Sequence, residues 1–99
     1  MDNKLLKTHA PIIEVPEEYE LDSEVEIKVA VGAEKHPMAS DHFIKSIELY
    51  KNNELVKRVD LSQSDQPEAI FSVVLDGSDE LTAKVECNVH GFFENSRNV

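Results

Sequence analysis

The chain of 99 residues contains a single cysteine and no tryptophan. One cysteine excludes an intramolecular disulfide and any metal site built from four cysteines. We therefore expect the protein to work in a reducing cytoplasm. Apolar runs extend over only a few residues, so no stretch is long enough for a transmembrane helix. The first residues, MDNKLLKTH, lack the apolar core of a signal peptide, and we expect none.

Positive charge is scarce. Ten Lys and Arg residues stand against 20 Asp and Glu residues, which gives a formal net charge of −10. This balance argues against nucleic acid and against an anionic membrane surface as partners, because both require a basic face. Hydrophobic residues make up 40% of the chain and charged residues 30%, as in a globular domain. The length predicts one small domain over residues 1–99.

Helical periodicity is missing as well, and short alternating segments take its place. In the segment 24–31, Val25, Ile27, Val29 and Val31 alternate with other residues, a period of two that is typical of a half-buried strand. Similar segments predict strands at residues 12–15, 44–50, 55–61, 69–75 and 81–87. This spacing predicts an all-β fold, an antiparallel β-sandwich of six or seven strands. Valine, isoleucine and leucine should fill its core, since aromatic residues are few.

The predicted turns have suitable residues. Asn52 and Asn53 separate two strand segments, and asparagine tolerates the positive φ of a tight hairpin. Asp76-Gly77-Ser78 is a second turn signal. The segment 12–15 lies between Pro11 and Pro16, which favours an edge strand. The polar tail, residues 94–99, is expected to be frayed.

The residues that could bind a transition metal are few and stand at the ends of predicted strands: His9, His36, His42, Cys87 and His90. Their spacings, H-x5-H and C-x-x-H, are each weak signals. A lone histidine in a polar loop is usually solvated, and a lone cysteine is usually a small buried apolar residue. Taken together, imidazole and thiolate suit Fe, Zn, Cu or Ni. Five ligands exceed the four of a structural zinc site and leave a sixth octahedral position open, which suits a redox iron that binds a small molecule.

Six segments carry a resemblance to a known family: THAPIIE (8–14), HPM (36–38), DHFI (41–44), IEL (47–49), DQPEA (65–69) and CNVHGF (87–92). In combination they resemble the superoxide reductases, also called neelaredoxins, and the iron domain of the desulfoferrodoxins. The resemblance implies a seven-stranded immunoglobulin-like sandwich holding one mononuclear non-haem iron. It implies four equatorial histidines and one axial cysteine as ligands: His9, His36, His42, His90 and Cys87. His90 would bind through Nδ1 and the other histidines through Nε2, while amides of Asn88, Val89 or His90 would donate to the sulfur.

The implied activity is the one-electron reduction of superoxide to hydrogen peroxide. A small electron carrier, usually rubredoxin, would supply the electron, and the family forms homodimers or homotetramers. Two alternatives remain open at this point. One is a non-catalytic iron-binding electron-transfer module of the same fold. The other is an immunoglobulin-like interaction domain that retains the ligands.

The chain departs from the resembled family just before the first histidine. Family members typically carry Glu-Lys there, and the lysine attracts the superoxide anion. Here the pair is Lys7-Thr8, so threonine stands at the lysine position. Successive side chains of an extended segment point to opposite sides, so Lys7 is not an automatic replacement. Lys35, next to His36, is a possible substitute.

Overall fold

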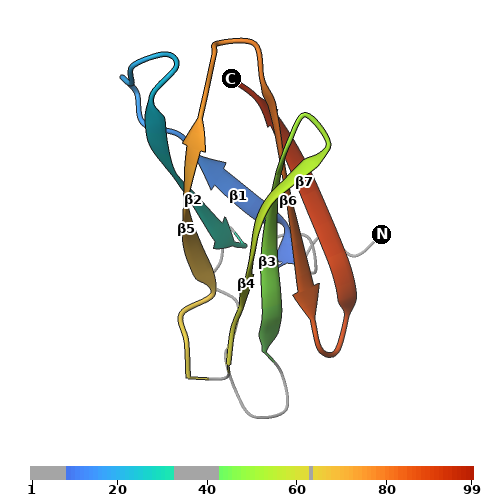
Figure 1. Cartoon of the computed structure of the whole chain (residues 1–99). Helices are drawn as coiled ribbons and strands as arrows, with labels where there is room; N and C mark the ends of the chain where they lie inside the picture. The colour runs from blue at the N-terminus through green and yellow to red at the C-terminus, as the bar shows by residue number, and fades with distance from the viewer. Residues whose placement is uncertain (1–8, 33–42, 63) are drawn as a thin grey trace.

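The computed structural model describes residues 9–32, 43–62 and 64–99, and the regular elements in these ranges are seven β-strands (Figure 1). Their bounds are β1 (Pro11–Glu14), β2 (Glu24–Val31), β3 (Ile44–Lys51), β4 (Glu54–Asp60), β5 (Glu68–Val74), β6 (Glu80–Cys87) and β7 (Gly91–Asn98). All paired strands are antiparallel. The predicted all-β antiparallel sandwich is confirmed.

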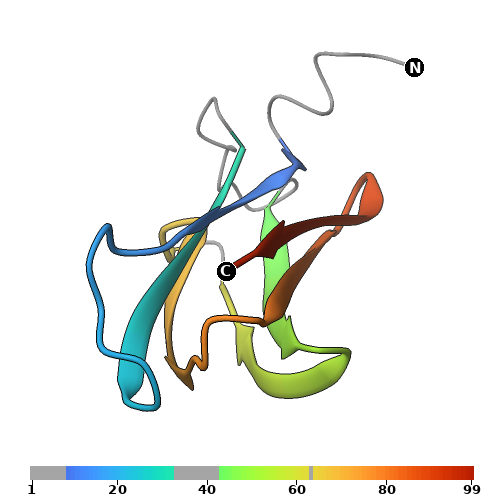
Figure 2. The same ribbon diagram turned by 90° about the horizontal axis from the view of Figure 1, so that it is seen from above.

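The strands form two sheets that face each other (Figure 2). One has the order β1-β2-β5 and the other the order β4-β3-β6-β7. Strand β1 is an edge strand, as its prolines predicted, and Pro11 is its first residue. The start of β1 lies beside the lower halves of β6 and β7 in Figure 1, and β1 contacts both strands, which brings two distant parts of the chain together.

Alternating side chains of both sheets fill the space between them. On β2, Val25, Ile27, Val29 and Val31 are buried, and the residues between them are half-buried or exposed. Strands β5 and β6 show the same alternation. Valine, isoleucine and leucine dominate the core, as predicted, and Phe71 is a fully buried aromatic side chain. This packing determines which residues of β6 point inward.

Both predicted turns are present. Asn52 and Asn53 join β3 to β4 with φ values of 50° and 70°, which is the left-handed pair of a two-residue hairpin. Gly77, with φ of 94°, lies in the turn between β5 and β6. A β-carbon at that φ would be strained, so glycine is suited to this position.

The prediction of a frayed tail is wrong. Residues 94–98 belong to β7, which pairs with β6 from Cys87↔Gly91 to Glu80↔Asn98. Backbone pairing defines this strand. Its side chains are mostly exposed and polar, so the sequence shows no apolar alternation that would predict it. Two of them reach β1: Asn95 Nδ2 donates to the Pro11 carbonyl at 3.2 Å and Arg97 to the Ile13 carbonyl at 2.9 Å. The C-x-x-H motif therefore lies at a hairpin and not beyond the last strand.

Among the described residues, no helix has the length and apolar character needed to cross a membrane.

Candidate metal centre

Three of the five predicted ligands meet at one end of the sandwich. The potential ligand atoms of His9, Cys87 and His90 all lie within 4.8 Å of one another. His90 Nδ1 is 3.1 Å from His9 Nε2 and 3.9 Å from Cys87 Sγ. His9 and Cys87 are each only 2% exposed, whereas His90 is exposed. The cluster thus reaches from the core to the surface.

Cys87 owes its position to the sheet. It is the last residue of β6 and pairs with Ile44 of β3 on one side and Gly91 of β7 on the other. The register of β3 shifts between Ile44 and Ser46, as a β-bulge produces at a site where a strand must re-aim a side chain. The alternation of β6 directs the sulfur inward, among the residues of the core.

His90 lies in the three-residue turn between β6 and β7. Gly91 follows with φ of 82°, a conformation that side-chain-bearing residues rarely adopt. This left-handed residue lets the chain reverse directly after the histidine. The imidazole is therefore held at the surface beside the buried sulfur.

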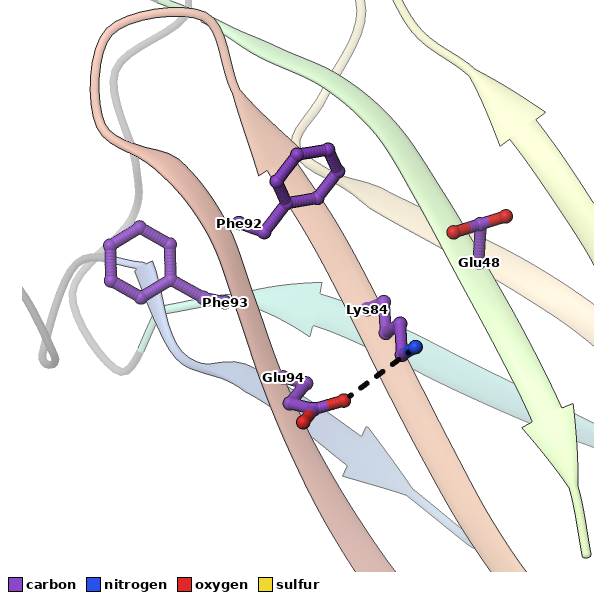
Figure 3. A pocket seen from close by; sticks show the side chains of 5 residues that line it. All are labelled: Glu48, Lys84, Phe92, Phe93 and Glu94. Carbon is purple, nitrogen blue, oxygen red and sulfur yellow. Dashed lines mark ion pairs between the residues drawn. The ribbon is translucent and has the colours of Figure 1, made fainter. Parts of the chain in front are cut away.

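His9 directly precedes β1 and is packed between two rings. The His90 ring meets it edge-on, with centroids 4.8 Å apart, and the Phe93 ring lies 4.7 Å away at a 34° tilt. Figure 3 shows Phe93 directed toward the start of β1, while Phe92 points to the opposite side of β7. The next residue, Ala10, accepts a hydrogen bond from the Gly32 amide at 2.9 Å. These contacts fix His9 although it lies outside any strand.

Asn88 connects the cysteine's turn to the start of β3. Its side-chain Oδ1 accepts from the Phe43 amide at 2.8 Å, and its own amide donates to the Phe43 carbonyl at 3.1 Å. The Asn88 amide is one of the three amides expected to donate to the Cys87 sulfur. In the structure it donates to the Phe43 carbonyl. In the sequence, Phe43 directly follows the predicted ligand His42.

The two spacings that involve His90 fit a shared transition-metal ion. Two nitrogens bonded to one ion at about 2.1 Å lie about 3.0 Å apart at a right angle, close to the 3.1 Å between His90 and His9. A sulfur and a nitrogen on one ion lie about 3.1–4.4 Å apart, a range that contains the 3.9 Å observed. The His90–His9 contact also suits a hydrogen bond between the rings, whose proton an ion would replace.

The other predicted site residues fall outside the described part of the chain. They are the predicted ligands His36 and His42 and the residues Lys7, Thr8 and Lys35. Within the described part, the sequence analysis missed the packing role of Phe93 and the side-chain role of Asn88. Strand alternation from Gly91 onward could have placed Phe93 on the inner side, had β7 been predicted. Nothing in the sequence indicated the Asn88–Phe43 pairing.

A shallow hollow of about 340 Å³ lies beside β7 and is lined by Glu48, Lys84, Phe92, Phe93 and Glu94 (Figure 3). Lys84 Nζ is 4.0 Å from a Glu94 oxygen and 4.9 Å from the centre of the Tyr50 ring. Its cation therefore has partners on its own face of the sheet. The cysteine and the two histidines do not line this hollow.

Comparison with known proteins identifies the family of this chain. The family model described as desulfoferrodoxin matches residues 1–96. The chain belongs to the desulfoferrodoxin family. It is 37% identical over 98 residues to a superoxide reductase from Pyrococcus abyssi, an alignment that covers 88% of this chain and 83% of the relative. Family members bind mononuclear iron, and the donor set of His9, Cys87 and His90 suits that metal.

Solved structures of the family share the fold. A superoxide reductase (neelaredoxin) from Ignicoccus hospitalis is 33% identical, with a TM-score of 0.81 over 93% of this chain and 80% of that one. The superoxide reductase from Nanoarchaeum equitans is 27% identical, with a TM-score of 0.80 over 94% of both chains. The desulfoferrodoxin homologues of Methanothermobacter thermautotrophicus and Archaeoglobus fulgidus are longer, and this chain spans 60% and 51% of their lengths.

Proposed function

We propose that the protein is a superoxide reductase. In the reaction, superoxide takes one electron and two protons and leaves as hydrogen peroxide, with no dioxygen formed. The observation that carries the proposal is the convergence of the His9, Cys87 and His90 ligand atoms, from opposite ends of the chain, within 4.8 Å. Family membership supports it, because the matched relatives include proteins named superoxide reductase.

The proposed iron ligands are four histidines and one cysteine: His9, His36, His42, His90 and Cys87. His90 binds through Nδ1 and His9 through Nε2, which are the two atoms that face each other at 3.1 Å. The remaining histidines belong to the H-x5-H motif outside the described residues. When bound, the iron supplies a one-electron couple and an open coordination position for superoxide. The whole chain, residues 1–99, acts as one iron-binding domain.

The buried cysteine controls the charge of the site. As a thiolate, Cys87 contributes one negative charge in apolar surroundings, where charge interactions are stronger than in water. Four neutral imidazoles add none, so a divalent ion and one thiolate leave a charge of about +1. This local charge attracts the superoxide anion against the overall charge of −10. When iron is bound, the Cys87 thiolate would donate electron density to it.

The aromatic neighbours keep one side of the site dry. Phe93 covers the His9 ring, which is 2% exposed, so water has little access from the β1 side. Such support fixes the orientation of a ligand ring. His90 is exposed, and Val89 and Phe92 beside it are 55% and 73% exposed. We assign this surface to the approach of a small electron carrier of the rubredoxin type.

Product analysis tests the proposal. The iron-loaded protein is supplied with superoxide and a one-electron reductant, and peroxide and dioxygen are both measured. We expect one peroxide for each superoxide consumed and no dioxygen from the protein-catalysed reaction. Dioxygen at half the superoxide consumed would indicate a dismutase. Full iron occupancy without accelerated superoxide loss would instead indicate the electron-transfer module.

A further inference from the structure

Contacts among the described strands and turns hold the three described ligands. Cys87 is fixed by strand pairing to β3 and β7. His90 lies in the turn that the same pairing closes. The segment of His9 is fixed by the Gly32 amide on Ala10 and by Asn95 Nδ2 on the Pro11 carbonyl. The backbone positions of these ligands thus follow from hydrogen bonds within the fold, none of which uses a ligand atom.

Such preorganisation favours binding, because the ligand side chains need not be ordered at the moment of capture. His9 and Cys87 are buried, and the His9 ring is wedged between His90 and Phe93. The nitrogen pair already has nearly the spacing that a shared ion imposes. The 3.9 Å between the sulfur and His90 Nδ1 lies within the range for a shared ion.

His9, Cys87 and His90 have the chemistry of a complete metal site that needs fewer protein ligands than the proposed iron centre. Two imidazoles and one thiolate, with a water as fourth ligand, form a familiar tetrahedral set for Zn²⁺. The same donors suit Co²⁺ and exclude Mg²⁺ and Ca²⁺, which require oxygen ligands. Five ligands are needed for the proposed iron centre but not for holding an ion of this class.

We propose that His9, Cys87 and His90 alone form a high-affinity site for a borderline divalent ion such as Zn²⁺ or Co²⁺. His36 and His42 then complete the coordination of an ion that is already held. One consequence is competition, because nitrogen and sulfur ligands generally bind Zn²⁺ more strongly than Fe²⁺. The inference deepens the proposed function, since it uses three ligands of the same site.

Cobalt titration of the metal-free full chain tests the proposal. Co²⁺ is added under anaerobic, reducing conditions, and the thiolate-to-cobalt charge-transfer absorption is followed to saturation. The informative variant is the double substitution His36→Ala/His42→Ala. We expect it to bind one Co²⁺ per chain, with the charge-transfer band, at an affinity within about tenfold of the unaltered chain.

Matched single variants serve as controls. His9→Ala and His90→Ala each remove one ligand of the trio and should weaken Co²⁺ binding by about 100-fold or more. Cys87→Ser should lose the charge-transfer band. Circular dichroism of each metal-free variant shows whether the β-sandwich is retained, and a histidine variant that loses it is replaced by the glutamine substitution at the same position.

The outcomes separate this inference from the proposed function. If the unaltered chain binds no Co²⁺, both fail. If it binds Co²⁺ but the folded double variant does not, the trio is insufficient and only this inference is overturned. A double variant that binds Co²⁺ without the charge-transfer band overturns it as well, because Cys87 would then not be a ligand. Stoichiometric binding with the band supports it.

Discussion

His90 Nδ1 lies 3.1 Å from His9 Nε2, although 81 positions separate the two residues in the chain. The two nitrogens face each other because β7 returns alongside β6 and sends Asn95 and Arg97 across to β1. Hydrogen bonds made by the polar strand β7 thus place His9, near the start of the chain, next to His90, near its end. The proposed metal centre depends on this arrangement.

Cys87→Ser should abolish the thiolate-to-iron charge-transfer absorption of the oxidised protein and weaken iron binding, because a serine hydroxyl remains protonated and is a poor ligand for iron. Visible absorption and iron content of the purified variant measure both effects. The conservative size of the substitution protects the core. An unchanged absorption band would show that the sulfur does not bind the metal.

Asn88 is predicted to stabilise the metal-free fold. Asn88→Ala removes the acceptor of the Phe43 amide and should lower the free energy of unfolding by about 1 kcal/mol. Asn88→Asp keeps an acceptor oxygen at this position and serves as the matched variant. Urea unfolding of the metal-free proteins gives both values. If the two variants are equally destabilised, the side-chain hydrogen bond is not the cause.

Asp79 holds the opposite end of the sandwich. Its buried carboxylate accepts from Asn52 Nδ2 at 2.9 Å and from the Asp76 amide at 2.8 Å. Asp79→Ala leaves both donors without this acceptor and should lower the free energy of unfolding by about 2–3 kcal/mol. Glu54→Ala, at an exposed position of the neighbouring hairpin, is the control and should change little.

Metal binding should survive the Asp79 substitution. Residue 79 precedes β6 and Cys87 ends it, so the length of the strand, about 23 Å, separates them. Cobalt binding to Asp79→Ala, measured at a temperature where the variant is folded, should match that of the unaltered chain. A lost charge-transfer band in the folded variant would contradict this separation of stability from the site.

Asp76 predicts a pH dependence of stability. Hydrogen bonds from the Ser78 amide and hydroxyl hold the pKa of the Asp76 carboxyl below its ordinary value of 3.8. Because the pKa of this carboxyl is lower in the folded chain than in the unfolded chain, its ionisation stabilises the fold at any pH above the unfolded-state pKa. That stabilisation is lost as the pH falls through the folded-state pKa. Between pH 5 and about pH 2.5, the metal-free chain should therefore lose more stability than Asp76→Asn. Parallel pH profiles would refute the assignment.

Lys35→Ala tests the source of attraction for superoxide. If Lys35 substitutes for the lysine that Thr8 replaces, its removal should slow superoxide association severalfold and flatten the dependence on ionic strength. The comparison variant, Thr8→Lys, restores a cation next to His9 in the sequence and should have the opposite effect. Rates after a superoxide pulse at several salt concentrations measure both. An unchanged rate in Lys35→Ala removes this residue from the mechanism.

The sequence predicted the parts of the fold that depend on apolar alternation. Val25 to Val31 on β2 and the buried residues of β6 follow a period of two because one face of each strand is buried. Asn52 and Asn53 identified their hairpin through their tolerance of positive φ. Strand β7 has no such signal: its residues from Glu94 to Asn98 are exposed, and its pairing with β6 uses backbone groups that every residue carries.

The residues of the candidate site could be named from the sequence, but their positions in the fold could not be predicted. Resemblance to the family identified His9, Cys87 and His90, and the structure adds their convergence. That convergence depends on β7, which the sequence analysis missed, and on contacts between distant residues, such as Phe93 with His9 and Asn88 with Phe43. No local pattern encodes such contacts. The ligation by His36 and His42 stays a prediction.

The most direct test of the account is a superoxide pulse. The iron-loaded protein is reduced without oxygen and mixed with substoichiometric superoxide, and its visible absorption is followed. The account predicts a rapid rise of the thiolate-to-ferric band, equal in amount to the superoxide added, with one peroxide formed for each iron oxidised. Fully loaded ferrous protein that leaves superoxide to disappear at its spontaneous rate, without this band, would contradict it.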